Sequence, residues 1–166
     1  MNQLDFTIRE ATETDMPAVR VIYNHYVATS TCTFQIEEET EQERLDWFRG
    51  RSTGHGVLVA EHRGEIVGWA ALSAWKSRAA YARSAEASVY VRPEFHRRGI
   101  GRALLIRLIE RARAAGFHTV IGGVCTEHTG SLALQESQGF RRVAHFHEVG
   151  YKFGRWLDVA YLQLIL

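Results

Sequence analysis

The chain has 166 residues, of which 46% are hydrophobic and 23% are charged, proportions that are ordinary for a soluble globular protein. This length favours a single domain over residues 1–166. A formal net charge of +1 argues against broad electrostatic attraction to nucleic acid or to an anionic membrane, so any anion must be recognised locally.

The cysteines and the amino-terminal segment indicate the cellular compartment. Cys32 and Cys125 form no CxxC pair and no disulfide framework, and we expect both to be reduced thiols. The first residues are too polar for a signal peptide, and no apolar run approaches the length that spans a membrane. These features predict a cytoplasmic protein that has neither nucleic acid nor a membrane as its partner.

The first half of the chain predicts a strand, two helices and a hairpin. Alternation over residues 5–10 indicates a strand, and apolar residues at helical spacing over 12–28, with Pro17 near the start, indicate a helix. Acidic residues early in 37–51 suit the positive end of a second helix. Two apolar runs over 56–75, separated by "HRGE", predict a β-hairpin.

The second half predicts strands alternating with helices. Residues 85–91 favour a strand that ends before Pro93, and 101–116 predict an amphipathic helix. The remaining segments are a strand over 118–125, a short helix over 129–140, and two strands over 141–151 and 155–166. This order of elements indicates a mixed α/β domain around one central sheet.

The sequence "HRRGIGR", residues 96–102, joins the predicted strand to the amphipathic helix. The first backbone N–H groups of a helix lack partners, and Gly99 and Gly101 have no Cβ atom to keep an anion away from them. The helix dipole adds positive charge there, as do Arg97, Arg98 and Arg102. The corner therefore predicts a phosphate or pyrophosphate site.

Two common phosphate-binding motifs do not match this corner. No GK[ST] follows Gly99, which excludes a Walker loop, and the G-x-G-x-x-G spacing of a dinucleotide fingerprint stops after Gly101. A basic surface loop before an ordinary helix remains an alternative.

The segment "RPEFHRRGIGRALL" after "SVYV" resembles the acetyl-coenzyme A loop of the GNAT N-acetyltransferases, [Q/R]-x-x-G-x-[G/A], with His96 at its first position. Four blocks extend the resemblance to the phosphinothricin and methionine sulfoximine acetyltransferases: "YNHYVATSTCTF" (23–34), "WKSRAAY" (75–81), "AEASVYV" (85–91) and "VGYKFGRWLDV" (149–159).

This resemblance implies a single-domain GNAT fold, acetyl-CoA as cosubstrate, no metal, and a homodimer with "GYKFGRW" near its interface. It implies that coenzyme A lies where two parallel strands splay apart, beside Ser88 to Val91 and opposite Thr119 to Val124. The backbone N–H near Val89 would support the developing oxyanion. The implied cofactor contacts are Val89, Tyr90, Val91, Arg97, Arg98, Gly99, Ile100, Gly101, Arg102 and His128.

Glu86 is the candidate catalytic residue. A protonated amine must lose a proton before it attacks a thioester, and a carboxylate can accept that proton. Glu86 shares strand parity with Ser88 and Tyr90, so the three side chains are expected on one face. A structural ion pair between Glu86 and Arg83 is the alternative.

Two positions depart from the family pattern. Gln135 stands in "LQE" where relatives carry a histidine, and glutamine cannot exchange a proton at neutral pH. His128 stands where asparagine touches the cofactor, and imidazole can donate a similar hydrogen bond. Ser131 is either a further contact or a helix-start residue.

The acceptor pocket is expected near a basic corner. Lys76 and Arg78 would suit an acceptor that carries a carboxylate or phosphinate, although a solvated basic loop is the alternative. Phe34, Tyr81 and Tyr151 either line the pocket or belong to the core. The expected substrate-binding residues are Phe34, Lys76, Ser77, Arg78, Tyr81, Ala87 and Ser88.

His145 and His147 share one face of a strand, but two histidines with no nearby Cys, Asp or third His make a poor metal site, and we expect none. Asp158 and Trp156 are interpreted as structural.

The leading functional hypothesis is acetyl transfer from acetyl-CoA to the α-amine of a small amino acid-like acceptor. Acetylation of another amine, such as a polyamine, a drug or a protein N-terminus, is a rival within the same chemistry. A non-catalytic acetyl-CoA-binding module is a third possibility.

Overall fold

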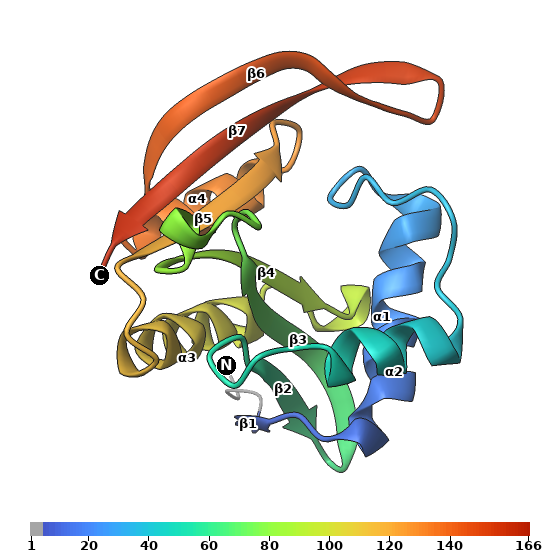
Figure 1. The fold of residues 1–166 in the computed structure, drawn as a ribbon. Helices are drawn as coiled ribbons and strands as arrows, with labels where there is room; N and C mark the ends of the chain where they lie inside the picture. Colours follow the sequence, from blue (N-terminus) through green and yellow to red (C-terminus); the bar gives the residue numbers. More distant parts are fainter. Residues whose placement is uncertain (1–4) are drawn as a thin grey trace.

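Seven strands form one mixed sheet in the computed structural model, which describes residues 5–166 (Figure 1). Their order is β1-β2-β3-β4-β5-β7-β6, and every neighbouring pair is antiparallel except the parallel pair β4 and β5. The strands are β1 Thr7–Glu10, β2 Val57–His62, β3 Glu65–Ala74, β4 Ser84–Val91, β5 Thr119–Cys125, β6 Arg141–Lys152 and β7 Arg155–Ile165. The expected α/β domain around a central sheet is confirmed.

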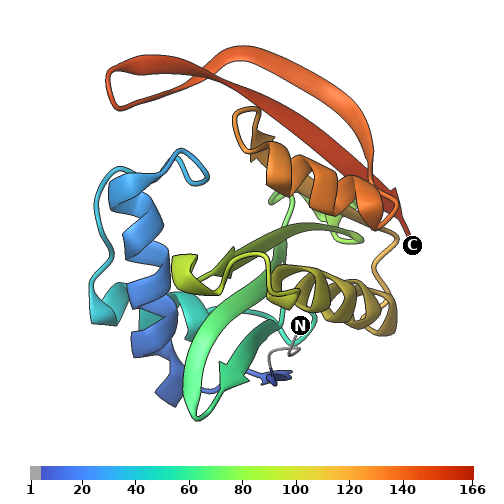
Figure 2. The same ribbon diagram turned by 180° about the vertical axis from the view of Figure 1, so that it is seen from behind.

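The α-helices of the described chain cover both faces of the sheet (Figures 1 and 2). They are α1 Met16–Thr29, α2 Glu41–Arg49, α3 Ile100–Ala114 and α4 Thr129–Ser137. One core lies between α1, α2 and the sheet, and a larger one lies between the opposite face and α3 with α4. The amphipathic pattern of α3 is confirmed, since Ile100, Leu104, Leu108 and Ala112 are all buried. No described helix is long and apolar enough to cross a membrane.

Helix α2 begins later than the sequence pattern predicts. Thr40 caps it, because its hydroxyl accepts a hydrogen bond from the N–H of Glu43 and the Glu43 carboxylate accepts one from the N–H of Thr40. The acidic residue before the cap, Glu39, pairs with the buried guanidinium of Arg44 at 2.6 Å. That guanidinium also lies 5.3 Å from the centre of the Trp69 ring of β3, and this contact fastens α2 to the sheet.

The parallel strands β4 and β5 pair over only part of their length. Residues 84–86 of β4 pair with 119–121 of β5, and beyond Glu86 the two strands diverge. The splayed strands that the resemblance implied are therefore confirmed. From Ala87 onward, one edge of β4 faces a gap instead of a neighbouring strand.

The long hairpin of β6 and β7 arches over the loop that follows α1 (Figure 1). Lys152, near its tip, is buried, and its ammonium donates hydrogen bonds of 2.8 Å to the carbonyl oxygens of Ser30 and Thr33. Burial lowers the pKa of this ammonium. The hairpin therefore holds residues 30–33 in place beside the gap.

Candidate active site

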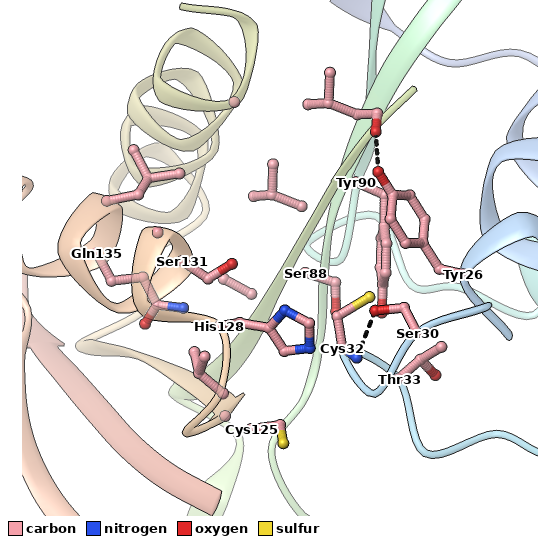
Figure 3. A pocket seen from close by; sticks show the side chains of 18 of the residues that line it. Tyr26, Ser30, Cys32, Thr33, Ser88, Tyr90, Cys125, His128, Ser131 and Gln135 are labelled. Atoms are coloured by element: carbon pink, nitrogen blue, oxygen red, sulfur yellow. Dashed lines mark hydrogen bonds between the residues drawn. The ribbon is translucent and has the colours of Figure 1, made fainter. Parts of the chain in front are cut away.

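A cleft of about 680 Å³ lies where β4 and β5 diverge. It is lined by the end of α1 and the loop that follows it, by β4 and β5, and by residues of α3, α4 and β7. Figure 3 shows Tyr26 and Cys32 on one side of the cleft and His128, Ser131 and Gln135 on the other. Such a pocket beside an open strand edge suits a long, narrow ligand.

The corner between β4 and α3 forms one end of the cleft. Gly99 precedes the first residue of α3 and has a φ of 85°, a left-handed conformation that a Cβ atom disfavours. Arg97 is also left-handed, with a φ of 58°. Among residues 5–166, no group accepts a hydrogen bond from the backbone N–H groups of residues 97–102. Free donors at a helix start form an anion site.

His96 anchors this corner to the end of β4. Its Nε2 lies 2.9 Å from the carbonyl oxygen of Val91 and 2.7 Å from the hydroxyl oxygen of Tyr26. The Tyr26 hydroxyl also donates to the Val91 carbonyl, and the Tyr26 ring lies nearly parallel to the imidazole. A histidine can therefore hold the loop by its side chain while the backbone N–H groups remain available.

Glu86 is the last residue of β4 that pairs with β5, so its side chain lies where the gap opens. Burial raises the pKa of its carboxyl group, and the positive charge of Lys76 offsets part of that rise. Burial also raises the pKa of Tyr161, with a smaller effect from the charge of Glu86. Within residues 5–166 Glu86 forms no ion pair, so the structural alternative with Arg83 is wrong.

A hydrogen-bonded bridge crosses the cleft between the loop after α1 and the start of α4. The Thr31 hydroxyl donates to the Glu127 carboxylate at 2.9 Å and lies 2.9 Å from His128 Nε2. Because its one proton goes to Glu127, this hydroxyl accepts from Nε2–H, and Nδ1 of His128 is left as an acceptor. Burial lowers the pKa of His128, so the imidazole is neutral at neutral pH.

Two further groups of the cleft bear on ligand binding. The Gln135 Oε1 atom is buried and has no hydrogen-bond partner among the described residues. Cys32 lines the cleft as a free thiol, and burial raises its pKa. Cys125 is also free, and the two cysteines do not pair with each other in this fold.

Most of the expected site residues line the cleft: Phe34, Glu86, Ala87, Ser88, Val89, Tyr90, Val91, Arg97, Ile100, Gly101 and His128. Ser131 and Gln135 join them. The ring of Tyr90 stacks on Trp69 with the centroids 4.8 Å apart, so Tyr90 offers a ligand its backbone more readily than its ring.

The remaining expected residues lie outside the cleft. Arg98, Gly99 and Arg102 are on the exposed side of the corner. The expected acceptor residues Lys76, Ser77, Arg78 and Tyr81 lie on an exposed segment after β3. Tyr151 and Trp156 pack on each other and are 57% and 61% exposed, so neither is a core residue.

The sequence pattern did not single out Tyr26, Thr31 or Tyr161, which all line the cleft. Tyr161 had a usable signal, because alternation along β7 puts it on the same face as Val159. A Cβ atom on Gly123 would lie 2.9 Å from the Tyr161 ring, so this glycine makes room for the ring.

One premise about metal binding is wrong. His145 and His147 do have an aspartate nearby: Asp158 Oδ2 lies 2.8 Å from His145 Nε2 and 3.0 Å from His147 Nδ1.

Comparison with known proteins gives one consistent result. The model of the acetyltransferase (GNAT) family matches residues 19–140. An L-amino acid N-acyltransferase of Escherichia coli is 38% identical over 96% of this chain and 94% of its own length. An L-methionine sulfoximine/L-methionine sulfone acetyltransferase of Salmonella typhimurium has the same identity and coverage.

A solved structure gives the same match in three dimensions. It is a GNAT superfamily phosphinothricin acetyltransferase from Sinorhizobium meliloti in complex with acetyl-CoA. It is 34% identical to this chain, with a TM-score of 0.91 over 97% of this chain and 88% of the other.

Proposed function

The chain belongs to the acetyltransferase (GNAT) family and is an acetyl-CoA-dependent N-acetyltransferase, and on this premise we propose that its acceptor is the α-amine of a small amino acid-like molecule. Methionine sulfoximine and phosphinothricin represent the acceptor type. The proposal rests on the position of Glu86: its carboxylate, whose pKa is raised, lies where the cleft opens between β4 and β5. We take residues 1–166 as one acetyltransferase domain.

The residues of the cleft fit acetyl-CoA. The free N–H groups of residues 97–102 suit its diphosphate, and the unpaired edge of β4 after Glu86 suits the amide groups of its pantetheine arm. Gln135 Oε1 and His128 Nδ1 are acceptors that suit the N–H groups of that arm.

Bound acetyl-CoA supplies an activated acyl group as a thioester. Glu86 removes the proton that the acceptor amine carries near neutral pH, directly or through one water, and so frees the nitrogen lone pair for direct attack. The backbone N–H near Val89 would stabilise the negative charge that develops on the acyl oxygen. As the C–N bond forms and the C–S bond breaks, coenzyme A would leave as a thiolate that takes a proton from solvent. The raised pKa of Glu86 makes it a stronger base than an exposed carboxylate.

The exposed basic segment after β3 supports an anionic acceptor. Lys76 lies close enough to Glu86 to lower its pKa, so a ligand at Glu86 lies within the field of this ammonium. Arg78, two residues further on, is exposed and can reorient toward a carboxylate.

Replacing Arg78 with Ala should lower kcat/KM for methionine sulfoximine about fivefold, because an ion pair at an exposed arginine contributes about 1 kcal/mol. An acceptor amine without a carboxylate should be acetylated at the wild-type rate. The measurement is thiol release with both kinds of amine, and Arg113→Ala, on the exposed face of α3, is the matched control.

If Arg78→Ala lowered kcat/KM equally for both kinds of amine, or for neither, Arg78 would not be the residue that binds the acceptor carboxylate. Unchanged activity of the Arg78→Ala variant would favour the rival hypothesis, in which the acceptor is a polyamine, a drug or a protein N-terminus. A non-catalytic acetyl-CoA-binding module would release no thiol above background with any of these amines.

We further propose a homodimer formed through the β6–β7 hairpin, which exposes a group of large apolar side chains. Its members are Val143, Phe146, Val149, Tyr151, Phe153 and Trp156. Such a surface suits a protein interface.

Light scattering should give twice the chain mass for the wild type, and the double variant Val149→Glu/Trp156→Glu should give the monomer mass. A wild-type monomer at micromolar concentration would contradict the dimer.

A further inference from the structure

Three side chains that commonly bind metals meet on the β6–β7 hairpin, outside the cleft. They are His145 and His147 from β6 and Asp158 from β7, and one ligand atom of each lies within 4.8 Å of the other two. None of these residues lines the cleft, so acetyl transfer gives them no role.

The strand register brings the three side chains together. His145 and His147 are two residues apart on β6 and therefore share a face. Phe146 pairs with Val159 and Gly150 pairs with Leu157, so residues 147–149 form a bulge opposite Asp158 alone. Within the bulge, Glu148 has a φ of 48°, and its backbone N–H donates to Asp158 Oδ1 at 2.8 Å.

The nitrogens of both histidines converge on one oxygen atom. His145 Nε2 lies 2.8 Å and His147 Nδ1 lies 3.0 Å from Asp158 Oδ2, and the two rings are stacked with their centroids 4.3 Å apart. Ligands at zinc-like bond lengths around a tetrahedral ion are about 3.3 Å from one another. The two histidine–aspartate distances therefore need to lengthen by only about 0.3 to 0.5 Å to reach this spacing, and the three ligand atoms already lie within 4.8 Å of one another.

These shifts do not disturb the core. The side chains of His145 and His147 are 47% and 79% exposed, so their rings can rotate against solvent. The Glu148 N–H meanwhile holds the other oxygen of Asp158 and fixes the plane of the carboxylate, as residues around metal ligands commonly do.

We propose that His145, His147 and Asp158 form a structural site for a divalent transition-metal ion of the zinc type. Two imidazoles and one carboxylate favour such ions over calcium or magnesium, which prefer oxygen ligands. The exposure of the histidines leaves the remaining coordination positions to water.

An ion at this site would connect the hairpin to a wall of the cleft. The carbonyl oxygen of Asp158 accepts a hydrogen bond of 3.0 Å from the N–H of Thr126, in the segment that leads to His128. Metal binding to the folded hairpin should therefore raise the melting temperature. The alternative is that the three side chains stabilise the bulge by their hydrogen bonds alone.

Calorimetric titration of the full chain, without an affinity tag, with Zn²⁺ tests the proposal. The expected result is one ion per chain with a Kd on the order of 10 μM or tighter, and a higher melting temperature in its presence. His147→Ala should weaken binding about tenfold, and His145→Ala/His147→Ala should abolish the binding. Exposed His25, on α1, provides the control variant His25→Ala, which should bind Zn²⁺ as the wild type does.

Co²⁺ supplies a readout that depends on coordination. Visible absorption bands that appear with the wild type and are lost in the double variant would place the ion at these side chains. The proposal is overturned if the wild type shows no saturable Zn²⁺ binding up to about 1 mM. It is equally overturned if the double variant retains the affinity of the wild type within a factor of ten.

Discussion

Replacing Glu86 with Gln should lower kcat by roughly 10²- to 10⁴-fold, the usual loss when a general base is removed. The Kd for acetyl-CoA should not change, because the expected contacts of the cofactor are with the corner at residues 97–102 and with backbone groups of β4. Steady-state thiol release and calorimetric titration with acetyl-CoA measure the two quantities. A variant that retains more than a tenth of wild-type kcat would exclude Glu86 as the base.

The pH dependence separates a base from a residue that only shapes the site. Burial raises the pKa of Glu86, so the carboxylate becomes protonated at a higher pH than an exposed glutamate would. The wild-type rate should therefore increase with pH through this raised pKa, and the Glu86→Gln variant should lack that increase.

The raised pKa of Glu86 also predicts that the Glu86→Gln variant is at least as stable as the wild type. Because the folded-state pKa of Glu86 lies above the unfolded one, its charged form costs the fold free energy at any pH above the folded value. Gln removes that charge, so the melting temperature at neutral pH should stay the same or rise. A lower melting temperature would contradict the assignment of the raised pKa to burial of the charge.

Replacing Gly99 with Val should weaken acetyl-CoA binding about thirtyfold, since a branched side chain in a left-handed conformation costs about 2 kcal/mol. Gly99 has a φ of 85° at the start of α3. A valine relieves the strain by leaving this conformation, which turns the N–H groups of the corner away from the diphosphate. Binding then has to restore the strained conformation.

Gly64 offers a matched control. Its φ of 82° is nearly the same, and a Cβ atom at either glycine would meet no other atom within 4 Å. Gly64 lies in the turn between β2 and β3 and is not part of the corner at residues 97–102. Gly64→Val should therefore lose a similar amount of stability in thermal unfolding but keep the wild-type Kd. Equal losses of affinity in the two variants would refute the role of the corner.

Local sequence patterns predicted much of the fold. Residues 85–116 contain the strand, the glycine corner and the amphipathic helix in direct succession. The spacing of the hydrophobic residues, Pro93 and the positions of the glycines are sufficient to locate these three elements. The start of α2 was missed because the acidic run from residue 37 looks helical throughout. The Thr40–Glu43 capping box was present in the sequence and marks the true start.

The candidate site was predictable where its residues share one strand or one corner. Glu86 and the corner lie on such contiguous segments. Thr31 reaches the cleft because Lys152, more than a hundred residues away, binds the carbonyl groups of its loop, and no local pattern encodes that contact. Asp158 is similarly brought to His145 and His147 by a bulge, which shifts the strand register without a visible sequence signal.

Amide NMR during titration with acetyl-CoA tests most directly whether the backbone of residues 97–102 holds the diphosphate. The amide resonances of these residues should shift together and saturate at the ligand concentration at which the heat of binding saturates. S-acetylpantetheine, which lacks the diphosphate, should shift resonances of β4 and leave those of the corner in place. If acetyl-CoA binds and the corner resonances do not move, the diphosphate is held elsewhere and the corner is not its site.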